Sequence, residues 1–130
     1  MIEEIVTLET AELLKAAGFE EKVRIFYESV GIKGDFELFE SYKAQNYNAN
    51  VSSFSATTLY IAQKWLRETK NLHIPIIRNA CGYSYDICKA DNGTHIAEGV
   101  FKGPNDGGQW DTYEEALEAG IFEALKLIKT

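Results

Sequence analysis

The chain has 130 residues, of which 45% are hydrophobic and 12% aromatic, a composition that is typical of a folded domain and excludes a disordered chain. Its 13 basic and 20 acidic residues give a formal net charge of −7, which disfavours nucleic acid and anionic membranes as partners. No apolar run approaches the roughly 20 residues of a membrane span, and the acidic start lacks the features of a signal peptide. We therefore expect a cytoplasmic protein with one domain over residues 1–130.

The chain begins with a predicted helix at about residues 8–17. Thr7 or Thr10 can cap its first turn, because either hydroxyl can accept from a free backbone N–H group. Gly18 stands just past the last helical residue, where a glycine commonly ends a helix.

A β-hairpin is predicted next, with strands at residues 23–28 and 35–41. Both stretches alternate between two side-chain sets, although a short helix at 35–41 is an alternative. Residues 42–54 are polar and rich in turn-forming residues, with no sustained periodicity. They predict a long loop, and long loops in compact domains are either functional or mobile.

Residues 55–71 predict the central amphipathic helix. Ser55 is a suitable N-cap, and Asn71 tolerates the left-handed conformation that often ends a helix. Apolar residues recur at the three- and four-residue spacing of one helical face, namely Leu59, Ala62, Trp65 and Leu66.

The period then changes from 3.6 to 2, which predicts β-structure. Three strands are expected, at residues 72–77, 83–88 and 95–101. Pro75 places the first at a sheet edge, because proline has no N–H for the ladder. Asp91-Asn92-Gly93 predicts the turn between the second and third strands, since Asn and Gly accept positive φ at low cost.

The last helix is predicted at residues 112–128. Thr112 and Glu115 have the spacing of a capping box, and the small Gly120 indicates close approach to the sheet. The predicted fold class is therefore α+β. We expect an antiparallel sheet of about three to five strands packed against helices, with an α-β-β-β-α unit over residues 55–128.

Motifs for catalysis and cofactor binding are missing from the sequence. It contains no GK[ST] phosphate loop and no G-x-S-x-G elbow. Its histidines and cysteines lack the close pairs that start zinc sites; they are His73, Cys81, Cys88 and His95. We expect no catalytic residue, no cofactor, no metal ligand and two free thiols.

Two sets of charged residues leave other functions open. A small hydrolase or nucleotide-modifying enzyme would use one of three carboxylates, Asp35, Glu37 or Asp86, with His73 or His95. Nucleic-acid binding would need the single basic cluster to form one patch; its members are Lys64, Arg67, Lys70 and Arg78. Solvated surface charge is the preferred interpretation of both sets.

Aromatic residues in or beside the predicted loops form the candidate interaction surface. These are Tyr42, Tyr47, Phe54 and Trp110. Exposed aromatic side chains that gather in a patch are typical of protein-binding surfaces.

Five segments carry a resemblance to a known group of proteins: Ser55-Ala56-Thr57, AQKWLRE at 62–68, residues 71–76, GYSY at 82–85 and TYEEALEAGIFEALKLI at 112–128. They resemble small uncharacterised proteins from phages and mobile elements of gut anaerobes, over most of residues 1–129. The resemblance implies a phage-like cytoplasmic protein and assigns no activity. Where that group often has a proline after Ser-Ala, this chain has Thr57.

Two shorter resemblances concern the C-terminal half. The element order over residues 55–128 is similar to the double-stranded RNA-binding domain, which holds phosphates with basic residues at the start of its last helix. Here Glu114 and Glu115 occupy that place and would repel phosphate, so only the topology is implied. GGQWDTYEEALE at 107–118 resembles the strand-to-helix ending of HicB-type antitoxins. That resemblance implies toxin binding alone, since no DNA-binding tail follows Thr130.

The hypothesis that these patterns favour is a phage or mobile-element accessory protein that acts through protein–protein interaction. Its partner would be a host or phage protein, or a second copy of the chain. The alternatives are the small enzyme described above and a nucleic-acid-associated or HicB-like antitoxin module.

Overall fold

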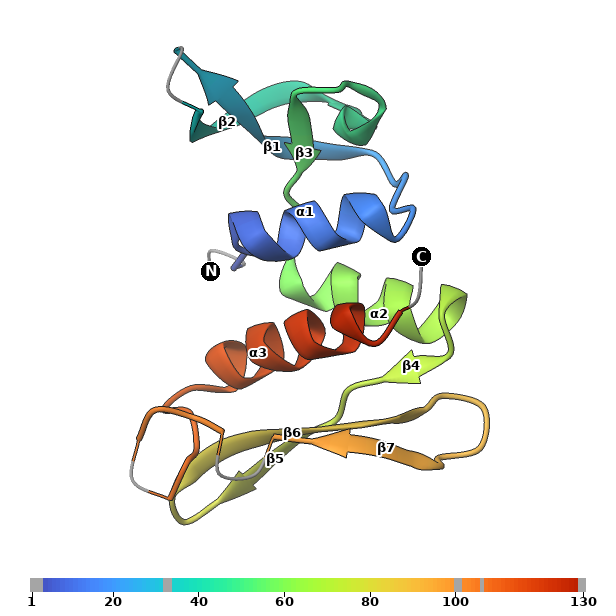
Figure 1. Cartoon of the computed structure of the whole chain (residues 1–130), viewed down its shortest axis with the longest axis vertical. Coiled ribbons are helices and arrows are strands. Elements are labelled where there is room, and N and C mark those ends of the chain that lie inside the picture. Colours follow the sequence, from blue (N-terminus) through green and yellow to red (C-terminus); the bar gives the residue numbers. More distant parts are fainter. Residues whose placement is uncertain (1–3, 32–33, 100–101, 106, 129–130) are drawn as a thin grey trace.

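The computed structural model describes residues 4–31, 34–99, 102–105 and 107–128 (Figure 1). Within these ranges the chain forms three α-helices and two antiparallel sheets, which confirms the predicted α+β class. The helices lie between the two sheets, one sheet at each end of the long axis (Figure 1). In the part of the chain that is described, no helix is both long and apolar enough to cross a membrane.

The first sheet contains the predicted hairpin, with β1 (Val23–Val30) paired to β2 (Asp35–Gln45). On its other edge β1 pairs with β3 (Ser53–Ser55). The predicted long loop at 42–54 is therefore wrong: β2 continues to Gln45 and is followed by a short 3-10 helix, η1 (Tyr47–Ala49).

Asn48 explains why this polar segment is ordered. Its side-chain nitrogen donates to the Phe19 carbonyl at 2.8 Å, and its side-chain oxygen accepts from the Ser55 backbone N–H at 2.8 Å. Such side-chain bonds to the backbone replace a regular ladder and leave no hydrophobic period in the sequence.

Helix α1 (Leu8–Ala16) has Thr7 as its N-cap, which confirms one of the two predicted caps. Helix α2 (Leu59–Thr69) begins later than predicted, because its N-cap is Thr58 and not Ser55. Ser55 instead pairs with Phe26 in the first sheet, so its backbone is already hydrogen-bonded. The Thr58 hydroxyl accepts from the Ile61 N–H at 3.2 Å. The predicted end of α2 is confirmed by Asn71, which has a φ of 58°.

The second sheet is built around β6 (Gly82–Lys89). One edge of β6 pairs with β4 (Leu72–His73) and, in the same register, with β5 (Ile76–Asn79). The predicted strand at 72–77 is thus interrupted at Pro75, on a sheet edge as expected. The other edge of β6 pairs with β7 (His95–Glu98). Its predicted extension to Val100 and Phe101 lies outside the described residues.

Helix α3 (Tyr113–Lys126) packs its apolar side on β6. Its predicted cap is confirmed: the Thr112 hydroxyl accepts from the Glu115 N–H at 3.1 Å and donates to the Glu115 carboxylate at 2.9 Å. The predicted close approach at Gly120 is also confirmed. A Cβ atom there would lie 2.7 Å from Ile74 Cγ2 and 3.0 Å from Tyr85 Cβ.

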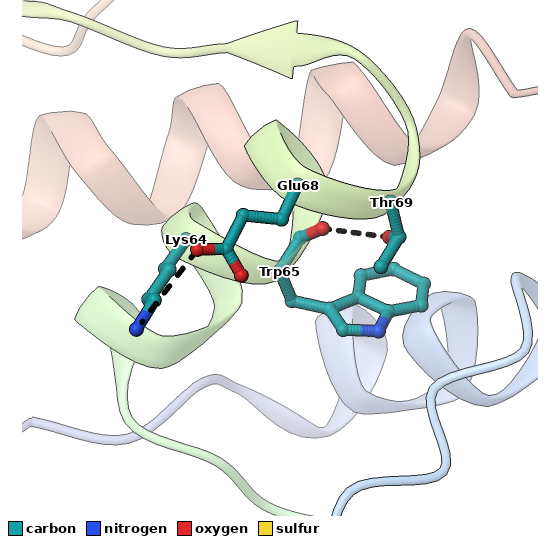
Figure 2. A network of polar contacts seen from close by, with 4 residues as sticks. All are labelled: Lys64, Trp65, Glu68 and Thr69. Atoms are coloured by element: carbon teal, nitrogen blue, oxygen red, sulfur yellow. Dashed lines mark hydrogen bonds and ion pairs between the residues drawn. The ribbon is translucent and has the colours of Figure 1, made fainter.

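One hydrophobic core connects all three helices with the second sheet. Its fully buried members include Leu14, Phe19, Leu66, Ile74, Ile87, Leu117 and Ile121. From α2, Trp65 points into this core, with its ring 5.3 Å from the ring of Phe19 in an edge-on arrangement. In Figure 2 the Trp65 ring extends from α2 away from the Lys64 side chain, which forms an exposed pair with Glu68.

Candidate binding groove

An open cleft of about 600 Å³ lies where α3 meets the segment before α1 and the loop that carries Trp110. We call it the α1–α3 groove. Most of its lining surface is apolar, and its apolar residues are Ile5, Leu59, Pro104, Trp110, Ala119 and Phe122. A concave, mainly apolar surface with a few polar groups is the usual form of a binding site.

The lining of the α1–α3 groove also contains two threonines, Thr7 and Thr10, and five glutamates, namely Glu4, Glu9, Glu114, Glu115 and Glu118; among the described residues, no lysine, arginine or histidine contributes to it. Their charge affects two neighbouring tyrosines. The pKa of Tyr27 is raised by burial and then by the negative charges of Glu118 and Glu9. The pKa of Tyr60 is raised by desolvation and then mainly by Glu114, to which its hydroxyl donates at 3.3 Å. The groove is therefore a region of negative potential.

Glu118 connects α3 to the start of α1. One carboxylate oxygen, Oε1, accepts from the Thr7 hydroxyl at 2.7 Å, the Thr10 hydroxyl at 2.6 Å and the Thr7 backbone N–H at 3.2 Å. The negative charge lies at the positive end of α1, where it is favourable. The other oxygen, Oε2, is buried and has no partner among the described residues. Glu118 thus fixes one wall of the groove.

Trp110 is held in the groove wall by the backbone. It forms an isolated bridge with Tyr83, with N···O distances of 2.8 and 2.9 Å, and its ring centroid lies 5.4 Å from that of Tyr85. The preceding turn is tied by Asn105, which donates to the carboxylate of Asp111 at 2.9 Å and accepts from the Gln109 N–H at 2.8 Å. This aromatic side chain therefore has a fixed position.

The four aromatic residues predicted as an interaction surface do not lie together. Trp110 lines the groove beside α3, whereas the other three belong to the first sheet region. Tyr42 is 87% exposed on β2. Tyr47 is buried and stacks on Phe26 with centroids 3.9 Å apart, and Phe54 packs beside Phe36 below the ammonium of Lys15. Of the four, only Tyr42 is mainly exposed, and Phe54 and Trp110 are both partly buried.

One of the predicted carboxylate–histidine combinations is present. His95 Nδ1 lies 2.9 Å from Asp86 Oδ1 on adjacent strands of the second sheet. Cys88 is the strand partner of His95 on one side and of His73 on the other. Both cysteines have free thiols. Across the described ranges, no three of the His, Cys, Asp and Glu side chains come together in a way that could hold a metal ion.

Three of the four basic side chains in the predicted cluster have separate partners. Lys64 lies 3.9 Å from Glu68 on the exposed side of α2 (Figure 2). Lys70 lies over the ring of Trp65, and Arg78 lies over the ring of Tyr83 on the second sheet. Their positive charges are therefore divided between α2 and β5.

Comparisons of the chain with protein-family models, with curated proteins and with solved structures found no match. The α1–α3 groove was not predicted as a site, although Trp110 was named as a candidate. Its two main walls come from opposite ends of the chain: Thr7 and Glu118 are separated by 111 positions. The acidic first turn of the last helix was a local signal, and it was interpreted as a feature of the helix start, with Thr112 and Glu115 as the capping box.

Proposed function

We propose that this protein acts by binding another protein in the α1–α3 groove, as an accessory protein of the phage or mobile-element type that it resembles. The observation that carries this proposal is the groove itself. It combines about 600 Å³ of open, mainly apolar space with a tryptophan in its wall. Tryptophan is among the residues that contribute most to protein–protein binding.

The chemistry of the groove favours a polypeptide partner. Its apolar surface can bury side chains such as leucine or valine, and its carboxylates stand around that surface as polar groups do at an interface rim. The wall is also rigid, because Glu118 and the Trp110 bridge fix both sides. A preformed surface binds with a smaller loss of conformational entropy.

Affinity capture from cells that carry the protein tests this proposal. Two variants are compared with the wild type, and each replaces one alanine by glutamine. Ala119→Gln fills the groove with a larger side chain on α3, and Ala16→Gln makes the same change at an exposed position of α1. We expect one protein to be captured in stoichiometric amount by the wild type and by Ala16→Gln, with or without nuclease. Ala119→Gln should lose it.

Phe122→Ala serves as a second groove variant, since it removes apolar lining and adds no bulk. Melting curves establish that each variant is folded before capture is compared. A partner that remains bound to both groove variants, or no stoichiometric partner at all, would refute the groove as the binding site.

A second candidate function rests on the pair His95 and Asp86. A carboxylate 2.9 Å from Nδ1 orients an imidazole and leaves Nε2 for a proton transfer, and Cys88 is the strand neighbour of His95. With Cys88 as the nucleophile, this pair would serve a small hydrolase. Hydrolysis of a panel of nitrophenyl esters and phosphates tests it: His95→Ala and Cys88→Ser should each abolish turnover, and variants that keep the wild-type rate, or a wild type without turnover, would exclude it.

A further inference from the structure

We infer that the segment bound in the α1–α3 groove is basic: a lysine- or arginine-bearing stretch of another protein whose apolar side chains lie on Trp110 and Phe122. This inference rests on the proposed binding function and adds the chemistry of the partner. It starts from an apolar groove whose shape and lining are described above, and it uses the charge around that groove to choose the occupant.

The carboxylates of the groove differ in how they are engaged. Glu118 holds α1, Glu115 holds the Thr112 cap, and Glu114 accepts from Tyr60. Among the described residues, the side chains of Glu4 and Glu9 make no hydrogen bond, and both are exposed. These two carboxylates stand at the rim, where a partner's ammonium or guanidinium group can reach them.

Charge also selects against other occupants. An acidic or neutral segment would lose the solvation of five glutamates without any compensating opposite charge. A second copy of the chain would bring a further net charge of −7 to a surface that is already negative. A basic segment instead gains an ion pair from each rim carboxylate, and the negative electrostatic field of the groove speeds its association.

Selection of random dodecapeptides displayed on phage, with the immobilised full chain as bait, tests the inference. The selected peptides are synthesised and their affinities are measured by fluorescence anisotropy at low and high salt. Glu4→Gln combined with Glu9→Gln removes two rim charges. Glu20→Gln combined with Glu21→Gln removes two exposed charges outside the groove lining and is the matched control.

We expect the selected peptides to alternate lysine or arginine with apolar residues and to bind more weakly as salt increases. The rim double variant should lose about five-fold in affinity, from two exposed ion pairs of ordinary strength, and the control under about two-fold. The selected peptides could instead be neutral in sequence, lose binding to Ala119→Gln and bind the rim double variant as well as the wild type. That result would overturn the basic partner and leave the groove as the binding site. Peptides that still bind Ala119→Gln would overturn the groove itself.

Discussion

Replacement of Glu118 by alanine tests whether this carboxylate joins the two ends of the chain. In the wild type it accepts three hydrogen bonds from Thr7 and Thr10, which precede it by more than 100 residues. Thr10 is fully buried, and after the change its hydroxyl would keep only the longer contact with Thr7 Oγ1 at 3.2 Å. The two groups of Thr7 are exposed, and water can replace the carboxylate there.

The expected loss follows from these surroundings. The loss of a buried hydroxyl's hydrogen bond to a carboxylate costs about 1.5–3 kcal/mol, and removal of a negative charge from the start of α1 costs about 0.3–1 kcal/mol more. We therefore expect Glu118→Ala to lower the free energy of unfolding by about 2–3 kcal/mol. For a chain of this size the melting temperature should fall by roughly 10 °C.

Urea and thermal unfolding, followed by circular dichroism, measure this loss. Glu118→Gln keeps one acceptor oxygen and should lose less than the alanine variant. Glu123→Ala, in the same helix, breaks only an exposed pair with Lys126 and should cost under about 0.5 kcal/mol. The reasoning would be refuted if Glu118→Ala and Glu123→Ala were equally stable, because the network would then contribute nothing.

Three further predictions concern other parts of the fold. Gly120→Ala should lower the melting temperature even though alanine favours helices, because its Cβ would lie 2.7 Å from the buried Ile74; a higher melting temperature would contradict this packing. Burial, and then the charge of Glu123, raises the pKa of Tyr85 from 10.0 to about 12. The unfolded chain therefore ionises first, so stability should be complete below pH 10 and fall by up to about 3 kcal/mol as the pH rises toward 12. Urea titrations at several pH values should show that Tyr85→Phe lacks this alkaline loss of unfolding free energy. A loss as large as that of the wild type would refute the assignment to Tyr85. Thr58→Ala should lower the free energy of unfolding by about 1 kcal/mol, because it removes a helix cap. Ser55→Ala should be nearly neutral, because the buried Ser55 hydroxyl has no partner among the described residues. The reverse order in urea unfolding would place the cap at Ser55.

Much of the fold was predictable because its signals are local. The spacing of Leu59, Ala62 and Leu66 defines a helix, the Thr112–Glu115 pair defines a cap, and Pro75 defines an edge. Each of these depends on a few neighbouring residues. Such patterns predicted the α+β fold class, the hairpin and the position of the last helix.

The errors arose where tertiary contacts override local preference. Ser55 is a good cap in isolation, but pairing with Phe26 draws it into a strand, and Thr58 replaces it. Residues 42–54 look like a loop because Asn48 orders them through bonds to Phe19 and Ser55, which no periodicity reveals. The capping preference of Ser55 is local in the sequence, whereas the strand pairing that prevents it from acting as the cap is not.

The groove was hidden for a similar reason. Trp110 could be named as a candidate, yet part of the wall, from Glu4 to Thr10, comes from the other end of the chain. Glu118 looks like one of many surface glutamates until Thr7 and Thr10 are placed beside it. An approach of segments more than 100 residues apart has no signature in a single sequence.

The most direct test of the central claim is a ¹⁵N–¹H correlation spectrum of the full chain during titration with a selected basic dodecapeptide. The account predicts that the shifts concentrate on the groove, at Glu9, Trp110, Ala119 and Phe122, and that Ala119→Gln abolishes them. Shifts confined to β2 around Tyr42, or to His95 and Asp86 on the second sheet, would contradict it and place the binding surface elsewhere.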